Sequence, residues 1–177
     1  MFTSHLSTRL RSELRRGFTL IELIIVVAII AIIAAAVFTA LDPAKRLHAS
    51  RNGRRWSDVT AVLGAIKTYQ TDNGGSLPSS IDTASGSVQF LGTSVGTCGS
   101  LTCVGQTVVS SSCGADFTST LRPYLKSIPT DPSTGNASNT RYYVNQDAYG
   151  IVSVGACDAE GESSGGGGTA PTVQVTQ

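Results

Sequence analysis

Apolar residues are concentrated in one early block of the chain. From Phe18 to Leu41, 21 of 24 positions are apolar, and only Thr19, Glu22 and Thr39 interrupt the run. A helix of this length spans about 36 Å at ~1.5 Å per residue, which exceeds the roughly 30 Å hydrocarbon core of a bilayer. The pattern therefore predicts a membrane-spanning helix over residues 18–41.

A cleaved secretory signal peptide is the main alternative, because such peptides also join a basic start to an apolar stretch. Their apolar cores are about 7–15 residues long. The run in this chain is longer than that before it reaches the small residues Ala34–Ala36, and it carries an acid near its start. We therefore expect the segment to be retained as an anchor.

A different pattern follows the apolar run. Apolar residues recur at spacings of three and four with charged residues between them, which is typical of an amphipathic helix: Trp56, Val59, Val62, Leu63, Ile66 and Tyr69. This helix should end near Asp72, because the following Asn73–Gly75 favours turns. Asp42-Pro43 either caps a second helix or kinks one continuous helix, since proline suits a first helical turn but disrupts an interior. The sequence leaves both possibilities open.

The second half of the chain is rich in Gly, Ser and Thr and predicts loops with short strands. Residues 88–91 and 106–109 are weak strand candidates, and Ala115 to about Leu125 forms a plausible short helix. Residues 141–145 and 149–154 indicate a hairpin with its turn at residues 146–148.

The C-terminal residues 158–177 contain a glycine run and predict a flexible tail. Val173 and Val175 alternate with polar residues, so an additional edge strand is an alternative for the last part of this segment.

Charge and composition exclude several classes of function. Thirteen basic and 12 acidic residues leave a net charge of +1, which gives no strong field for nucleic acid. The only histidines are His5 and His48, so Gly92-Thr93-Ser94-Val95-Gly96, which matches a hydrolase nucleophile elbow, has no downstream histidine to serve it. We expect no catalytic residues, no metal, no cofactor and no enzyme activity.

The charges flanking the apolar run give conflicting signals for its orientation. Arginines at positions 9, 11, 15 and 16 precede it, and a second cluster follows it, composed of Lys45, Arg46, Arg51, Arg54 and Arg55. The positive-inside rule alone does not decide between them. The downstream cysteines favour an oxidising compartment, so we place the N-terminus in the cytoplasm and expect the second cluster to form a solvated or subunit-facing helix surface.

Four cysteines lie beyond the apolar run, at Cys98, Cys103, Cys113 and Cys157. An even number in an oxidising compartment and the lack of a C-x-x-C favour disulfides over a zinc site. Three pairings are possible. We favour Cys98 with Cys103 and Cys113 with Cys157, because the second bond would attach the last strand to the preceding loop.

The segment Arg15-Arg16-Gly17-Phe18-Thr19-Leu20-Ile21-Glu22 resembles the processing site of type IV prepilins and pseudopilins. The resemblance implies that a membrane prepilin peptidase cuts between Gly17 and Phe18 and N-methylates Phe18. It also implies that Glu22 pairs with the terminal amine of a neighbouring subunit. Thr19-x-x-Glu22 also fits a capping box, which is the structural alternative for this acid.

The resemblance extends more weakly to Asp42-Pro43, Leu77-Pro78 and the Ile128–Pro132 segment, which are similar to parts of pilin heads. It implies a type IV pilin-like α+β fold in which a long helix, with its first half transmembrane, packs on a small antiparallel sheet. The expected parts are a cleaved basic leader, an assembly helix, its amphipathic continuation, a globular head and a flexible tail, at residues 1–17, 18–41, 42–72, 73–157 and 158–177.

The function implied by the resemblance is that of a structural subunit of a type IV pilus-like filament. Its implied partners are other copies of the chain in a helical filament, the prepilin peptidase, the pilus assembly platform and the membrane, without specific nucleic acid. The precursor would be a single-pass inner-membrane protein, and the assembled filament would lie at the cell surface.

Two other functions remain as alternatives: a pseudopilin of a type II secretion system, and a membrane-anchored extracellular binding protein. Asp158, Glu160 and Glu162 would suit a calcium site like that of some pseudopilins. We favour a solvated acidic turn for these residues, because they lead into a glycine run rather than a shaped loop.

Overall fold

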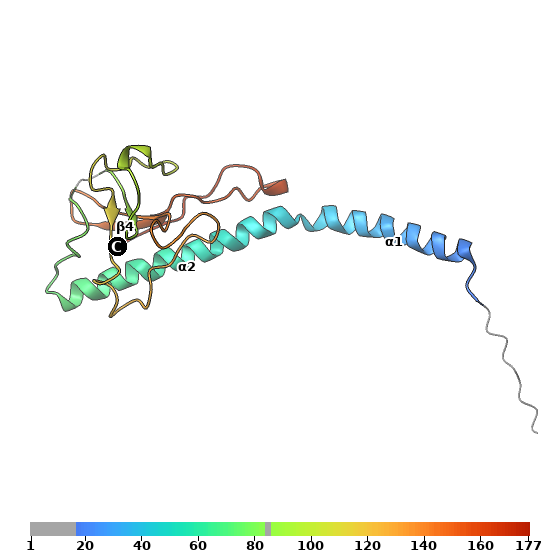
Figure 1. Ribbon diagram of the computed structural model, residues 1–177, viewed down its shortest axis with the longest axis horizontal. Helices are drawn as coiled ribbons and strands as arrows, with labels where there is room; N and C mark the ends of the chain where they lie inside the picture. Colours follow the sequence, from blue (N-terminus) through green and yellow to red (C-terminus); the bar gives the residue numbers. More distant parts are fainter. Residues whose placement is uncertain (1–16, 84–85) are drawn as a thin grey trace, which may run out of the picture. The chain divides into compact units, whose positions relative to one another are not determined.

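The computed structural model describes residues 17–83 and 86–177. Most of the predicted leader, residues 1–16, lies outside the described residues. The chain divides into two compact units, Met1–Leu41 and Asp42–Gln177. Figure 1 labels the principal element of the first unit, helix α1 (Leu20–Leu41), and helix α2 (Pro43–Asp72) of the second.

Helix α2 is a separate helix with its own N-cap. The Lys45 N–H donates to Asp42 Oδ1 at 3.3 Å, and Pro43 occupies the first turn, where its missing N–H is not needed. Asp42 has left-handed backbone angles, with φ 43° and ψ 72°, which interrupts the helical path. Of the two possibilities left open by the sequence, the structure therefore has a capped second helix.

Five short strands form one mixed sheet in the order β2-β1-β3-β4-β5. Their bounds are β1 (Gln89–Leu91), β2 (Gly114–Ala115), β3 (Tyr142–Gln146), β4 (Val152–Ala156) and β5 (Gln174–Thr176). Strand β2 pairs with β1 in parallel, and the other neighbours are antiparallel. The α+β class is confirmed, while the expectation of a purely antiparallel sheet is wrong at this edge. Two short 3-10 turns, η1 (Cys98–Ser100) and η2 (Ser164–Gly166), lie in the loops.

The two faces of the sheet bury different partners. The core on one face joins α2 to alternate residues of the strands, and it includes Val59, Val62, Leu63, Ile66, Leu91, Tyr142, Val144, Val152 and Val154. On the other face, Phe90 and Tyr143 pack with Val88, Cys103 and Cys157 under the loops. The period-two alternation of strand side chains explains this division. The predicted apolar face of the amphipathic helix is confirmed except at Trp56, which is 41% exposed.

Glycine is required at position 155 because an aromatic ring lies over the backbone there, on the loop-covered face of the sheet. The Tyr143 ring lies across its β4 partner Gly155, and a Cβ at that position would overlap the ring. The Tyr143 hydroxyl then donates to the side chain of Gln174 on β5 at 3.0 Å. The missing side chain thus lets one tyrosine connect three strands.

Two local predictions need correction, and a third is confirmed. Residues 106–109 form only an isolated bridge from Val108 to Val88. In place of the helix predicted over residues 115–125, Ala115 ends β2 and residues 118–124 form successive turns. Pro123 accounts for the second difference, because it has no N–H to donate to the preceding turn. The predicted 141–154 hairpin is confirmed as β3 and β4, with Asp147 Oδ1 accepting the N–H groups of Tyr149 and Ile151 in the turn.

The expectation of a flexible tail at residues 158–177 is also wrong. Strand β5 pairs with β4, so the alternating Val173 and Val175 mark the edge strand that was the alternative for this segment. Val173 is buried in the core beside α2.

The four cysteines form two disulfides, but the favoured pairing is wrong. The bonds join Cys98 to Cys113 and Cys103 to Cys157. Cys113 directly precedes β2, and Cys157 directly follows β4. Since β1 and β3 lie between those strands and neighbouring strands are ~4.8 Å apart, the two cysteines lie near strands about 14 Å apart, whereas a disulfide joins Cα atoms within ~7 Å.

A buried ion pair fixes α2 to the loop before β3. The Arg55 guanidinium donates two hydrogen bonds to the Asp131 carboxylate, from Nε at 2.6 Å and from Nη2 at 3.0 Å, and neither side chain is exposed. The expectation that Arg55 lies on a solvated or subunit-facing surface is therefore wrong. Its charge is tolerated because the bidentate geometry and further hydrogen bonds compensate its loss of water.

The pKa of the Asp131 carboxyl is lowered by its contacts. Burial alone would raise it, but hydrogen bonds from Arg55 and from the N–H groups of Ser133 and Thr134 outweigh burial and hold the pKa below its ordinary value. A carboxyl with a lowered folded pKa stabilises the fold above its unfolded pKa of about 4. That contribution is lost as the pH falls through the lower folded value.

Removing the Cys103–Cys157 bond should destabilise the head more than removing the Cys98–Cys113 bond. The sequence separations are 54 and 15 residues, and the chain-entropy model assigns about 4 and about 3 kcal/mol to loops of these lengths. Double serine variants of each pair should show this order in urea unfolding of the detergent-solubilised chain. Non-reducing peptide mapping checks the connectivity, and a Cys113–Cys157 peptide would contradict it.

Adjacent arginines on α2 should respond very differently to substitution. Arg55→Met leaves the Asp131 carboxylate buried without its partner, so we expect a loss of about 3–5 kcal/mol in the free energy of unfolding. Arg54 is 64% exposed and only 3.7 Å from Asp58, so Arg54→Met should change stability by about 0.5 kcal/mol or less. Urea unfolding monitored by circular dichroism compares the two variants, and equal losses would contradict the role of Arg55.

Candidate functional site

The Gly17-Phe18 bond lies in non-helical chain just before α1. Residues 17–19 have no regular structure and are exposed, and α1 begins at Leu20. A Cβ at Gly17 would meet nothing within 4 Å, and the Phe18 side chain is 90% exposed. Packing in the described residues therefore gives no reason for a glycine at position 17.

Glu22 forms a capping box with Thr19. The N–H and the hydroxyl of Thr19 both donate to Glu22 Oε2 at 2.8 Å, and the Glu22 N–H donates to Thr19 Oγ1 at 3.2 Å. These bonds satisfy N–H groups at the start of α1 that have no helical acceptor. The structural alternative considered for this acid is therefore present. Both bonds to the carboxylate use Oε2, and within the described residues Oε1 has no partner.

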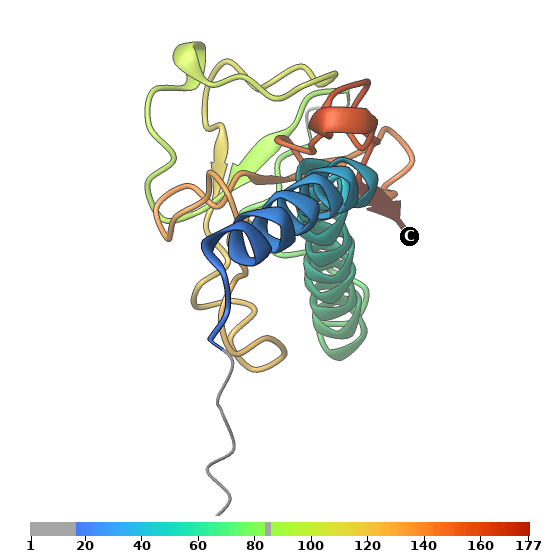
Figure 2. The same cartoon turned by 90° about the vertical axis from the view of Figure 1, so that its right-hand side faces the viewer.

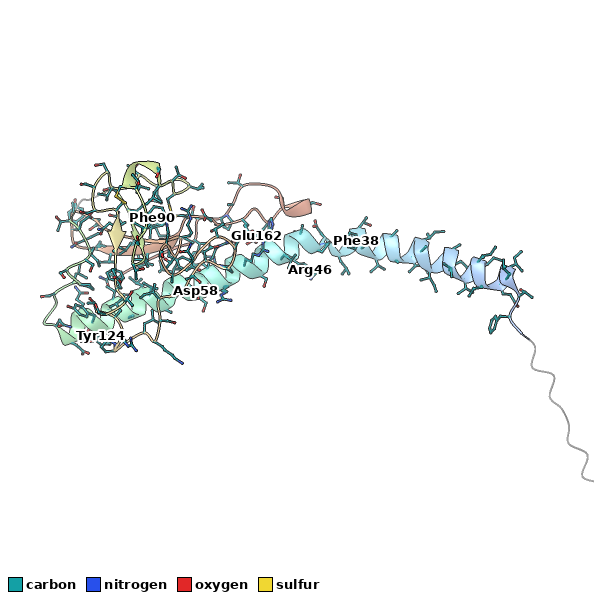
Figure 3. The ribbon with its side chains drawn as sticks, in the orientation of Figure 1. Phe38, Arg46, Asp58, Phe90, Tyr124 and Glu162 are labelled. Atoms are coloured by element: carbon teal, nitrogen blue, oxygen red, sulfur yellow. A yellow bond between two sulfur atoms is a disulfide. The ribbon has the colours of Figure 1, made fainter. Side chains whose placement is uncertain are left out.

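The side chains of α1 are apolar on all sides and make no core within the described chain. None of its residues is buried. Figure 3 shows its side chains, including the labelled Phe38, projecting around the helix. By length and composition α1 is long and apolar enough to cross a membrane. A helix that is apolar all round needs a lipid or protein environment to cover it.

The three C-terminal acids considered for calcium are each held by a basic or amide side chain. Arg141 donates to Asp158 from Nε at 2.6 Å and Nη2 at 2.7 Å, and Asn52 donates to Glu162 at 2.7 Å. Glu160 accepts from Arg51 at 2.9 Å and from Arg55 at 3.0 Å. The interpretation as a solvated acidic turn is wrong for Asp158 and Glu160, which are partly buried and bind Arg141, Arg51 and Arg55, whereas Glu162 is exposed.

The electrostatics of these acids follow from their partners. Burial raises the pKa of the Asp158 carboxyl, but hydrogen bonds from Arg141 and Thr134 outweigh burial and lower it. For Glu160, burial is likewise outweighed by hydrogen bonds from Arg55 and Arg51, and the pKa is lowered. Within residues 17–83 and 86–177, no group of three or more His, Cys, Asp and Glu side chains is arranged to hold a metal ion.

Sequence reasoning missed the polar centre of the head. Asn52 and Arg55 are buried on the same face of α2 as Val59 and Val62, at the same spacings of three and four. The buried face of α2 thus continues toward its N-terminus, where polar residues replace the apolar ones. This continuation was the available signal, but it does not identify the partners Asp131 and Glu160.

Comparison with known proteins gives one match. The family described as "Prokaryotic N-terminal methylation motif" matches residues 14–38, which include Gly17, Phe18, Glu22 and most of α1. No curated protein and no solved structure matches the chain. The motif and the apolar helix support membrane anchoring, and the motif favours a structural role. The chain therefore carries a prepilin-type leader and methylation motif and is consistent with the type IV pilin and pseudopilin family.

Proposed function

We propose that this protein is a structural subunit of a type IV pilus-like filament, made as a membrane prepilin and polymerised through α1. The observation that carries the proposal is the combination of an exposed Gly17-Phe18 junction with an entirely unburied apolar helix directly after it. A prepilin peptidase would cut after Gly17 and methylate the new amine of Phe18. Disulfides in the head fit an N-terminus in the cytoplasm and a head in an oxidising compartment.

Assembly would exchange one apolar environment for another. In the precursor, lipid covers the apolar side chains of α1, and in the filament the helices of neighbouring subunits replace lipid. The hydrophobic effect contributes little to this exchange, because lipid tails are as apolar as the helices, so packing and polar contacts must supply the specificity. Glu22 is the only charged side chain within α1 and is therefore the residue best suited to supply it.

The Glu22 carboxylate has the geometry to serve two partners at once. Thr19 satisfies Oε2, so Oε1 is available for the terminal amine of a neighbouring Phe18 after processing. The capping box and the assembly role are then compatible, because the first orients the carboxylate that the second uses. A charge pair in low dielectric is much stronger than in water, and one charge buried alone is costly.

The mature protein should begin at an N-methylated Phe18. Mass spectrometry of protein from sheared surface filaments should find that terminus. Gly17→Leu should block processing, because a peptidase that accepts glycine beside the bond has no reason to leave space for a branched side chain. Gly53→Leu changes an exposed glycine of α2 where a Cβ meets nothing within 4 Å, so it serves as a control that should be processed normally. Assembled protein that retains Met1 would refute the processing step.

Replacing Glu22 by glutamine or leucine should separate its two roles. Glu22→Gln keeps an oxygen that can accept from Thr19 but removes the charge, whereas Glu22→Leu removes both. Both precursors should reach the membrane and be cleaved, since losing an acid favours insertion. Filament yield, normalised to processed protein in the membrane, should fall strongly in both variants. Glu22→Asp, which is one methylene shorter, should give an intermediate yield.

Wild-type filament yield from Glu22→Gln, together with a loss of yield in Glu22→Leu, would show that only the capping box matters.

Cells that express the wild-type chain distinguish a pilus subunit from a pseudopilin of a secretion system, since both are made as prepilin-type precursors. Surface filaments that contain this chain support the pilus, whereas processed protein confined to the envelope supports the pseudopilin. A membrane-anchored binding protein would show neither cleavage after Gly17 nor assembly.

A further inference from the structure

Residues 158–168 lie along the N-terminal half of α2 and contact it over several turns. In Figure 2 the segment that contains η2 lies against this end of the helix, and Figure 3 marks Glu162 beside it. Glu160 binds Arg51 and Arg55 as described above. His48 Nδ1 lies 2.8 Å from the carbonyl oxygen of Gly161, and because a carbonyl only accepts, Nδ1 carries the hydrogen.

Asn52 binds the middle of this segment with all of its hydrogen-bonding groups. Its side-chain N–H groups donate to the Glu160 carbonyl oxygen and to Glu162 Oε1, both at 2.7 Å. Its Oδ1 accepts from the Glu160 N–H at 3.0 Å and from Arg55 at 2.7 Å. The residue is 1% exposed. A single buried amide therefore fixes both the backbone and a side chain of the segment.

The far end of the segment reaches the residue at which the helical path is interrupted. The Gly165 N–H donates to Asp42 Oδ2 at 2.8 Å, while Asp42 Oδ1 caps α2 through Lys45. Gly166, with φ 75°, lies directly on the helix surface. A Cβ there would be 2.7 Å from His48 Cε1 and 3.3 Å from the Ala44 Cβ.

Asp42 needs support to keep its conformation. A residue with a Cβ is disfavoured at φ 43°, although aspartate tolerates this region better than most residues, and Pro43 disfavours the right-handed helical conformation in the residue before it. Extended backbone is thus the ordinary state for a residue at this position. The side-chain hydrogen bonds of Asp42, to Lys45 within α2 and to Gly165 and Ser164 of the C-terminal segment, oppose that preference.

We propose that residues 158–168 form a clasp that holds Asp42 in its left-handed conformation and so maintains the interruption between α1 and α2. The clasp is locked to α2 by Asn52, His48 and Arg51, and its tip acts on Asp42 through Gly165. It connects the C-terminal segment of the chain to Asp42, the residue that follows α1. This inference does not depend on filament formation, because every contact lies within one head.

The test compares two adjacent glycines in the full chain in detergent micelles. Gly166→Ala places a Cβ against His48 and should lift the clasp. Gly167→Ala is the matched control, because its Cβ would come no closer than 3.7 Å to any atom outside its own chain neighbours, and its φ of −87° suits alanine. Residue-specific hydrogen exchange measured by NMR should rise about tenfold or more at Gly165 and Lys45 in Gly166→Ala only. The ¹³C shifts of Asp42 should leave their left-handed values in the same variant.

A second variant acts on the clasp far from Asp42. Asn52→Ala removes the bonds to residues 160 and 162, and if the clasp acts as a unit the Asp42 shifts should change there too. Exchange of the β3 and β4 amides at the wild-type rate shows that the head remains folded in each variant. Faster exchange at Gly165 with unchanged Asp42 shifts would overturn the proposal, and so would an equal effect of Gly167→Ala.

Discussion

The Arg55 guanidinium is the point at which three distant parts of the head meet. It binds Asp131 from the loop before β3, Glu160 from the C-terminal segment and Asn52 from its own helix. A buried cation without these partners would be strongly unfavourable, so the helix, the loop and the C-terminal segment are stable in their places only together. The strands of the sheet are only two to five residues long. Their pairing therefore holds few of the loop residues in place. The charged contacts and the two disulfides hold the remaining loops.

The sequence predicted those parts of the structure that depend on local pattern. The apolar helix, the face of α2 that contains Val59 and Ile66, its end at Asp72 and the β3–β4 hairpin each follow from periodicity or turn residues nearby. The burial of Arg55 depends on Asp131, which lies 76 residues later. The disulfide pairing depends on the order of the strands, because two intervening strands separate Cys113 from Cys157. Neither the burial of Arg55 nor the disulfide pairing can be predicted from residues that are close together in the sequence.

The glycine run of the C-terminal segment shows a further limit of composition. Gly165, Gly166 and Gly168 all have positive φ, and both Gly161 and Gly166 lie against other atoms without space for a side chain. Glycine-rich sequence is typical of flexible linkers because glycine gains most conformational freedom in the unfolded chain. The same missing side chain also permits close contact with a helix. Where buried partners such as Asn52 and His48 are present, close contact dominates, and the segment becomes part of the fold.

The single acid of α1 solves a problem that its apolar surface creates. Because apolar side chains cover all sides of this helix, packing against a similar helix has many nearly equivalent offsets along and around the axis. In the proposed filament, every offset but one leaves the Glu22 carboxylate in a low-dielectric environment without its cationic partner. Thr19 fixes the carboxylate in one orientation, so the free Oε1 points in a defined direction before a neighbour arrives. In that filament, the cost of the wrong offsets, rather than the strength of the right contact, would select the register of assembly.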